Sequence, residues 1–158
     1  AARALGAAAN LDYFVRISAD SPFIDPVVIT TAVDVARSEQ WDLVTNIFPR
    51  TFPRGMSVEV VKTDAFREML DGPMTEDECE HVTKAIYNRP EDFQITNFEA
   101  PQGDLSAINL TVDTPEDLKK AQWIDRKLGP QSSIAPLAEI IEAAREFDRI
   151  PGNEAVKQ

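Results

Sequence analysis

Short apolar runs alternate with segments that begin with helix-start signals, and this alternation constrains the fold more than any other feature of the sequence. The runs are rich in β-branched and aromatic residues, as buried strands are. They cover residues 12–18, 42–45, 57–62, 93–98 and 107–112. Strands separated by helices predict an α/β protein, specifically a three-layer α/β/α sandwich with a mixed, mostly parallel sheet.

Several helix starts follow from local capping chemistry. Asp25 before Pro26 suits an N-cap and first helical position, and Thr114 before Pro115 repeats the pattern. Thr75-x-x-Glu78 has the form of a capping box, and Gly129-Pro130 is a stop signal. The predicted helices cover residues 1–9, 26–38, a short stretch capped by Thr63, 75–88, 115–128 and 135–147.

The length of 158 residues fits one domain, which we assign to residues 1–150, followed by a tail at 151–158. The sequence contains no membrane-length apolar run and no signal-peptide pattern, and Cys79 is its only cysteine, so a cytoplasmic protein without disulfides is expected. The chain opens on an alanine-rich stretch without Met or an N-cap. We interpret this as a helix cut through the middle, with the N-terminal part of the domain missing.

Acidic residues outnumber basic ones 27 to 16, and the net charge is −11. This charge repels phosphate backbones, so nucleic acid is not expected as a partner. A small polyphosphate could still bind if a metal ion screened its charge locally.

Asp20 and Asp113 each follow an apolar run and precede a proline-started helix. Ligands of α/β sheets bind at the carboxyl ends of the strands, where both aspartates are expected. Mg²⁺ prefers a few carboxylates together with phosphate oxygens and water, and this pair would supply such a half-shell. Helix capping explains the same spacing equally well, and the spacing alone leaves both interpretations open.

Four blocks in order resemble the cytidylyltransferase family, and most closely its spore-coat polysaccharide biosynthesis branch, which is related to the CMP-KDO and CMP-neuraminate synthetases. They are RISADSPFIDPVVI, VTNIFPRTFPRGMSVEVV, EHVTKAIYNRPEDFQI and INLTVDTPEDLKKA. The resemblance covers nearly the whole chain. It implies an α/β nucleotidyltransferase that joins CTP to a sugar with Mg²⁺ and releases pyrophosphate, with Asp20 and Asp113 as the catalytic, metal-holding residues.

The chain departs from the family pattern in three places. It has Ala19-Asp20-Ser21-Pro22 where the branch usually shows Gly-Asp-Cys-Pro, and Ser57 where relatives have aspartate in the run before Glu59. The family's glycine-rich, basic CTP-binding loop has no counterpart here, although such loops hold the triphosphate. We therefore expect this chain alone to be inactive.

Further residues are candidates for substrate binding. Arg50 and Arg54 lie in a proline-rich loop and suit a carboxylate or phosphate, which favours an acidic sugar. Asn46 could bind a sugar hydroxyl, Glu59 is kept from the family motif, and Arg16 could pair with the Asp20 cluster.

Glu80 and His81 begin the block E-H-V-T, and the resemblance implies that they line the sugar side of the pocket. From helix spacing alone, His81 is instead a partly buried, hydrogen-bonding histidine.

The leading hypothesis is thus a cytidylyltransferase that transfers CMP to a sugar for surface polysaccharide biosynthesis and forms a homodimer. One alternative is a non-catalytic sugar-nucleotide-binding or dimerisation module. A metal-dependent phosphohydrolase is a further class, but its usual second aspartate, two residues after the first, is replaced here by Pro22.

Overall fold

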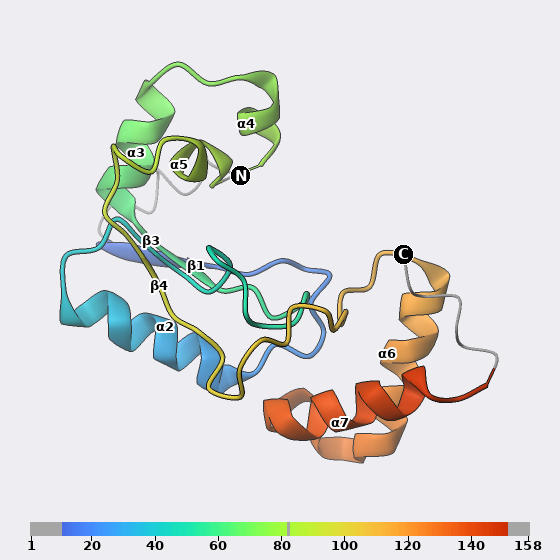
Figure 1. Ribbon diagram of the computed structural model, residues 1–158. Coiled ribbons are helices and arrows are strands. Elements are labelled where there is room, and N and C mark those ends of the chain that lie inside the picture. Colours follow the sequence, from blue (N-terminus) through green and yellow to red (C-terminus); the bar gives the residue numbers. More distant parts are fainter. Residues whose placement is uncertain (1–10, 82, 152–158) are drawn as a thin grey trace.

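The computed structural model describes residues 11–81 and 83–151, and its sheet has four strands in the order β1-β3-β2-β4. The strands are β1 (Tyr13–Arg16), β2 (Leu43–Thr45), β3 (Glu59–Lys62) and β4 (Ile95–Asn97). β3 pairs antiparallel with both β1 and β2, and β2 pairs parallel with β4. Strands β1, β2 and β4 therefore point the same way, so their carboxyl ends and the first residue of β3 meet at one end of the sheet (Figure 1).

The predicted α/β class with a mixed sheet is confirmed, but the expected majority of parallel pairings is not found among these strands. The reversed strand β3 lies between two strands of common direction, which makes two of the three pairings antiparallel. The predicted strand at 107–112 is also wrong. This segment forms only an isolated parallel bridge between Asn109 and Arg54, because its partner there is a loop.

Helices cover both faces of the sheet, as predicted for three layers. The helices are α2 (Pro26–Ser38), α3 (Thr63–Asp71), α4 (Glu76–Glu80), α5 (Lys84–Asn88), α6 (Pro115–Leu128) and α7 (Leu137–Asp148), with a 3-10 helix η1 (Gly129–Ile134) between the last two. Figure 1 shows α2 on one side of the sheet and α3, α4 and α5 on the other. Helices α6 and α7 pack together beside the end of the sheet where β1, β2 and β4 terminate.

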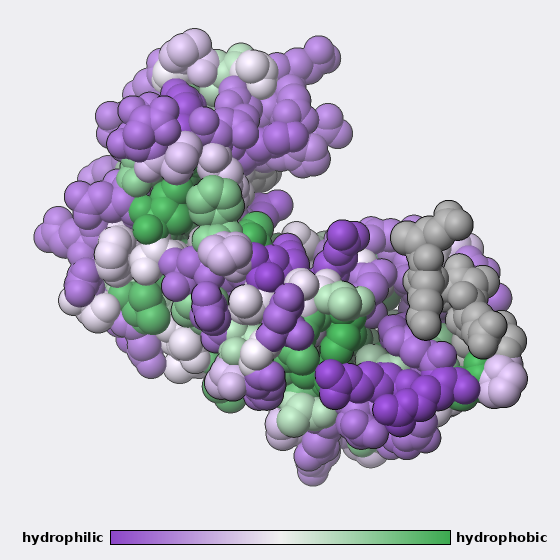
Figure 2. Space-filling model, in the orientation of Figure 1, coloured by the Kyte–Doolittle hydropathy of each residue, from purple (hydrophilic) through white to green (hydrophobic). Residues whose placement is uncertain are grey.

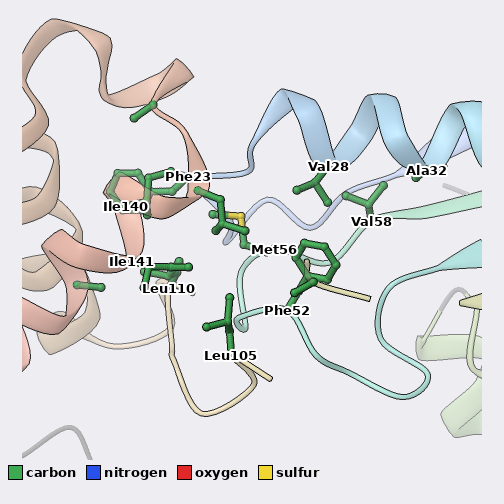
Figure 3. Close-up of a cluster of buried hydrophobic side chains, with 14 of the residues drawn as sticks. Phe23, Val28, Ala32, Phe52, Met56, Val58, Leu105, Leu110, Ile140 and Ile141 are labelled. Atoms are coloured by element: carbon green, nitrogen blue, oxygen red, sulfur yellow. The ribbon is translucent and has the colours of Figure 1, made fainter. Parts of the chain in front are cut away.

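Side chains of neighbouring strand positions enter two different cores, because they alternate between the faces of a sheet. Val44 and Val60 belong to the larger core under α2, which also takes in α7 and the loop before β3. Figure 3 shows Phe52 and Met56 of that loop among residues from these helices. Leu43 and Val61 face the smaller core under α3 and α5.

Most predicted helices are present, with two differences. The capping boxes at Thr75 and Thr114 are both formed, yet the expected helix over 75–88 is divided into α4 and α5 around His81. Thr63 is the first residue of α3, and its side chain caps nothing. The predicted helix at 1–9 and the tail at 152–158 lie outside the described residues.

Asp25 joins two helices that are distant in sequence. Its Oδ1 accepts a hydrogen bond from the backbone N–H of Val27 at 2.8 Å, and its Oδ2 accepts one from Leu137 at 3.1 Å. One buried carboxylate therefore caps α2, as predicted, and also fixes the start of α7. No helix in the described ranges combines the length and apolarity needed to cross a membrane.

Candidate functional site

A cleft of about 970 Å³ lies where the loop before β3, the segment after β1 and the start of α6 come together. Its lining is rich in hydroxyl, amide and charged side chains and contains no aromatic ring. The lining residues are Ser18, Asp20, Ser21, Arg50, Arg54, Gly55, Ser57, Ser106, Ala107, Asn109, Thr111, Asp113, Thr114, Glu116 and Asp117. Such a surface suits phosphates and sugar hydroxyls, which need hydrogen-bonding and charged partners.

The cleft brings together the two predicted aspartates. The backbone N–H of Val112 donates to the carbonyl of Asp20 at 3.0 Å, which places the segments after β1 and before α6 side by side. Asp20 is half-buried and accepts a hydrogen bond from Ser21, whereas Asp113 is exposed at the start of α6. Thr114 fills the N-cap of that helix, so capping does not occupy Asp113.

The donor set fits a hard cation only in part. Two carboxylates at one cleft match the protein ligands that Mg²⁺ commonly uses when phosphate and water complete its shell. No group of three His, Cys, Asp or Glu suited to a metal ion occurs within residues 11–81 and 83–151. The residues therefore fit a metal that arrives with a phosphate ligand, and not an all-protein cage.

Arg50 and Arg54 also line the cleft, as the sequence predicted. Arg50 donates to the carbonyl of Pro53 at 3.3 Å and to the hydroxyl of Ser57 at 3.1 Å, which fixes its guanidinium. Burial lowers the pKa of Arg50, and the neighbouring positive charge of Arg54 lowers it further. Two arginines in the lining of one cleft favour an anionic ligand.

Gly55 lets this arginine loop lie against the segment before Asp113. It has φ +87°, and an added Cβ would lie 2.7 Å from the carbonyl carbon of Leu110. Two backbone hydrogen bonds connect the two segments: the N–H of Arg54 donates to the carbonyl of Ile108 at 3.0 Å, and the N–H of Leu110 donates to the carbonyl of Arg54 at 2.9 Å. The arginines and Asp113 thus share one wall because a glycine permits close packing.

Glu59 does not reach the cleft, so its predicted substrate contact is corrected. It is fully buried, and Arg16 forms an ion pair with its Oε2. Oε1 accepts hydrogen bonds from Thr83 at 2.9 Å and from Tyr87 at 2.5 Å. Burial raises the pKa of Tyr87, and the charge of Glu59 raises it further, so the phenol stays protonated as a donor.

This buried network changes two other assignments. Arg16 pairs with Glu59 and not with Asp20 as expected, because it ends β1 directly opposite Glu59 in the antiparallel register. Asn46 is fully buried, its side chain donates to Met56 and accepts from Val58, and it therefore braces the loop before β3. The predicted contact of Asn46 with a sugar hydroxyl is incompatible with that burial.

The prediction that Glu80 and His81 line the sugar side of the pocket is not supported by their positions. Both are exposed at the end of α4, and neither lines the cleft. The imidazole of His81 lies 3.8 Å from the carboxylate of Asp77 on its own helix. The alternative of a partly buried histidine is wrong as well, because His81 occupies the turn that separates α4 from α5.

Asp117, Asn109 and Thr111 are cleft residues that the sequence did not suggest as functional. Asp117 lies in the first turn of α6, where it is buried and accepts a hydrogen bond from the N–H of Thr114 at 2.9 Å. Its place in the capping box, three residues after Thr114, is the sequence signal that could have identified it.

The outer surface is mostly hydrophilic, with a few exposed apolar side chains. Figure 2 shows hydrophilic residues over the outer surfaces of the α3–α5 and α6–α7 regions, with a hollow between them. Apolar side chains are exposed on the edge strand and after it, where Val15 is 40% and Ile17 is 39% exposed.

Comparisons with known proteins identify relatives of the chain. No protein-family model matches the chain. It is 28% identical over 143 residues to the spore coat polysaccharide biosynthesis protein SpsF of Bacillus subtilis (strain 168), covering 89% of this chain and 58% of that protein. It is 30% identical over 109 residues to the uncharacterized protein MJ1063 of Methanocaldococcus jannaschii, covering 68% of this chain and 44% of that protein.

A solved structure has the same fold. The cytidylyltransferase of Leptospira borgpetersenii serovar Hardjo-bovis matches with a TM-score of 0.81 and 26% identity, over 92% of this chain and 60% of that one. The chain thus spans roughly half of the curated relatives and three fifths of the solved one. The resemblance to the cytidylyltransferases is confirmed: the chain is related to them in sequence and shares their α/β fold.

Proposed function

We propose that this relative of the cytidylyltransferases supplies the acidic, metal-holding side of a nucleotidyltransferase site. The reaction is transfer of CMP from CTP to a sugar for surface polysaccharide biosynthesis, with release of pyrophosphate. The observation that carries the proposal is the placement of Asp20, Asp113, Arg50 and Arg54 around one cleft. The Bacillus relative is named for polysaccharide biosynthesis, which supports that pathway. The solved structure is named a cytidylyltransferase, which supports a cytidine nucleotide as the donor.

In this reaction a sugar hydroxyl oxygen bonds to the α-phosphorus of CTP, and the bond from that phosphorus to the bridging oxygen of the β-phosphate breaks. The hydroxyl proton leaves to solvent or a nearby base, and pyrophosphate departs. Asp20 and Asp113 would hold Mg²⁺, which neutralises phosphate charge when it is bound. Arg50 and Arg54 would bind the anionic part of the substrate, which favours an acidic sugar or a phosphate.

Most of the catalysis would come from positioning and charge neutralisation, because the sugar hydroxyl is itself the nucleophile. The aromatic-free lining leaves the nucleobase without a stacking partner among the described cleft residues. The residues of this chain would therefore bind the phosphates and the sugar.

The central test is Asp113→Asn in the full-length protein, with pyrophosphate release from CTP as the readout. Turnover should fall by about a hundredfold or more, because a metal ligand is lost while the helix cap remains on Thr114. Asp34→Asn, an exposed position on α2, removes the same charge away from the cleft and should change little. Unchanged turnover in Asp113→Asn would refute the metal assignment.

A non-catalytic sugar-nucleotide-binding or dimerisation module is the second candidate. It is favoured by the apolar side chains exposed on and just after the edge strand β1, Val15 and Ile17, which a partner surface could cover. Calorimetry with CTP and Mg²⁺ separates the two, since the enzyme needs metal-dependent CTP binding that Asp20→Asn abolishes. A homodimer and a cytoplasmic location remain predictions, and sedimentation at increasing protein concentration tests the first.

A further inference from the structure

Asp117 holds the backbone that carries Asp113. The Asp117 side chain is buried, and its Oδ2 accepts hydrogen bonds from the backbone N–H of Asp113 at 3.3 Å and of Thr114 at 2.9 Å. Its Oδ1 accepts one from Nδ2 of Asn109 at 3.3 Å. The first turn of α6 and the segment before it are therefore connected through one buried carboxylate.

The hydroxyl of Thr111 reaches the carboxylate of Asp113 itself. Its Oγ1 lies 2.9 Å from Oδ2 of Asp113 and 2.7 Å from Oδ1 of Asn109. A hydroxyl has a single proton and donates to one of them at a time. Oδ1 of Asn109 also accepts the backbone N–H of Thr111 at 3.1 Å, so it keeps a donor when the hydroxyl turns to Asp113.

This arrangement leaves one oxygen of Asp113 available. Oδ2 is oriented by Thr111, while no described side chain donates to Oδ1. Asp113 is exposed, so without the hydroxyl its carboxylate would be free to rotate in solvent. Carboxylates that bind metals are themselves commonly oriented by such hydrogen bonds from outside the metal's own ligand set.

We propose that Thr111 is a positioning residue for Asp113, with Asn109 and Asp117 fixing Thr111 and the backbone behind it. The inference rests on the proposed metal-holding role of Asp113. Thr111 sets the carboxylate rotamer that presents Oδ1 to a divalent cation, and it does not touch the cation or the substrate.

The experiment is a titration of the protein with Mn²⁺ in the presence of inorganic pyrophosphate, which supplies the phosphate ligand, followed by paramagnetic broadening of backbone amide signals around the cleft. Thr111→Val removes the hydroxyl and keeps the branched shape, and it should weaken Mn²⁺ binding about tenfold. Thr111→Ser returns the hydroxyl and should restore affinity. Thr31→Val removes a comparable hydroxyl on α2, bonded to the Val27 carbonyl, and should leave affinity unchanged.

Three outcomes distinguish this inference from the function on which it rests. If Asp113→Asn abolishes broadening and Thr111→Val retains wild-type affinity, the positioning role is refuted and the metal assignment stands. If wild-type protein shows no broadening at the cleft, the metal assignment fails and the inference fails with it. If valine disrupts the amide spectrum, Thr111→Ala takes its place, and the affinity ratio between alanine and serine variants decides the question.

Discussion

The contact at Gly55 offers a stringent test of how the cleft wall is built. Gly55→Ala places a Cβ 2.7 Å, 2.8 Å and 2.9 Å from backbone atoms of Leu110 and Thr111, which cannot move aside as a flexible side chain would. The residue also has φ +87°, a conformation that L-amino acids with side chains rarely adopt. The substitution therefore carries a backbone cost and a packing cost.

The magnitude follows from these two costs. Placing alanine in a left-handed conformation costs about 1–2 kcal/mol. Separating the two segments weakens the hydrogen bonds between Arg54 and its partners Ile108 and Leu110, at about 1 kcal/mol each. We expect Gly55→Ala to lower the free energy of unfolding by about 3–4 kcal/mol in total.

Gly103→Ala is the matched control. Gly103 has φ +89°, yet an added Cβ would meet nothing within 4 Å. Gly103→Ala should therefore lower the free energy of unfolding by the backbone cost alone. Alanine also makes the unfolded chain less flexible, but this stabilising effect is the same in both variants and cancels in their difference. Urea unfolding followed by tryptophan fluorescence measures the difference, which should be about 2 kcal/mol. Equal losses in the two variants would refute the packing argument.

Two further predictions concern buried polar groups. The pKa of Tyr87 is raised in the folded protein, so the unfolded chain releases the phenol proton at lower pH than the folded protein does. The protonated phenol therefore adds to the free energy of unfolding below about pH 10, and this stabilisation is lost progressively as the pH rises above that value. When the pH is raised from about 8 to about 10.5, the free energy of unfolding measured in urea should fall less for Tyr87→Phe than for the wild type, because phenylalanine has no proton to release. An equal fall in the two proteins would contradict this. Lys120 is buried and pairs with the partly exposed Asp148 at 2.9 Å. Asp148→Ala should lower the free energy of unfolding by about 2 kcal/mol because it leaves a buried charge unpaired, whereas Lys120→Met removes that charge and should lower it by less than about 1 kcal/mol. Thermal unfolding of both variants checks the order, and a larger loss in Lys120→Met would show that the ion pair itself stabilises the fold.

The sequence alone determined the features that depend on neighbouring residues. The N-caps at Asp25, Thr75 and Thr114 are all formed, because a capping side chain bonds to backbone two or three residues away. The apolar runs from β1 to β4 were likewise recognisable, since burial selects their composition. The four family blocks also led to Asp20 and Asp113, which do line one cleft.

Tertiary structure alone decided which polar residues face that cleft. Glu59 and Asn46 were both candidates for substrate binding, but their side chains turn inward to partners such as Tyr87 and Met56. The pairing of Arg16 with Glu59 depends on the register of two antiparallel strands, which lie 43 positions apart in sequence. Local sequence patterns contain no information on such partners, because the free energy of a buried charge depends on what the fold brings beside it.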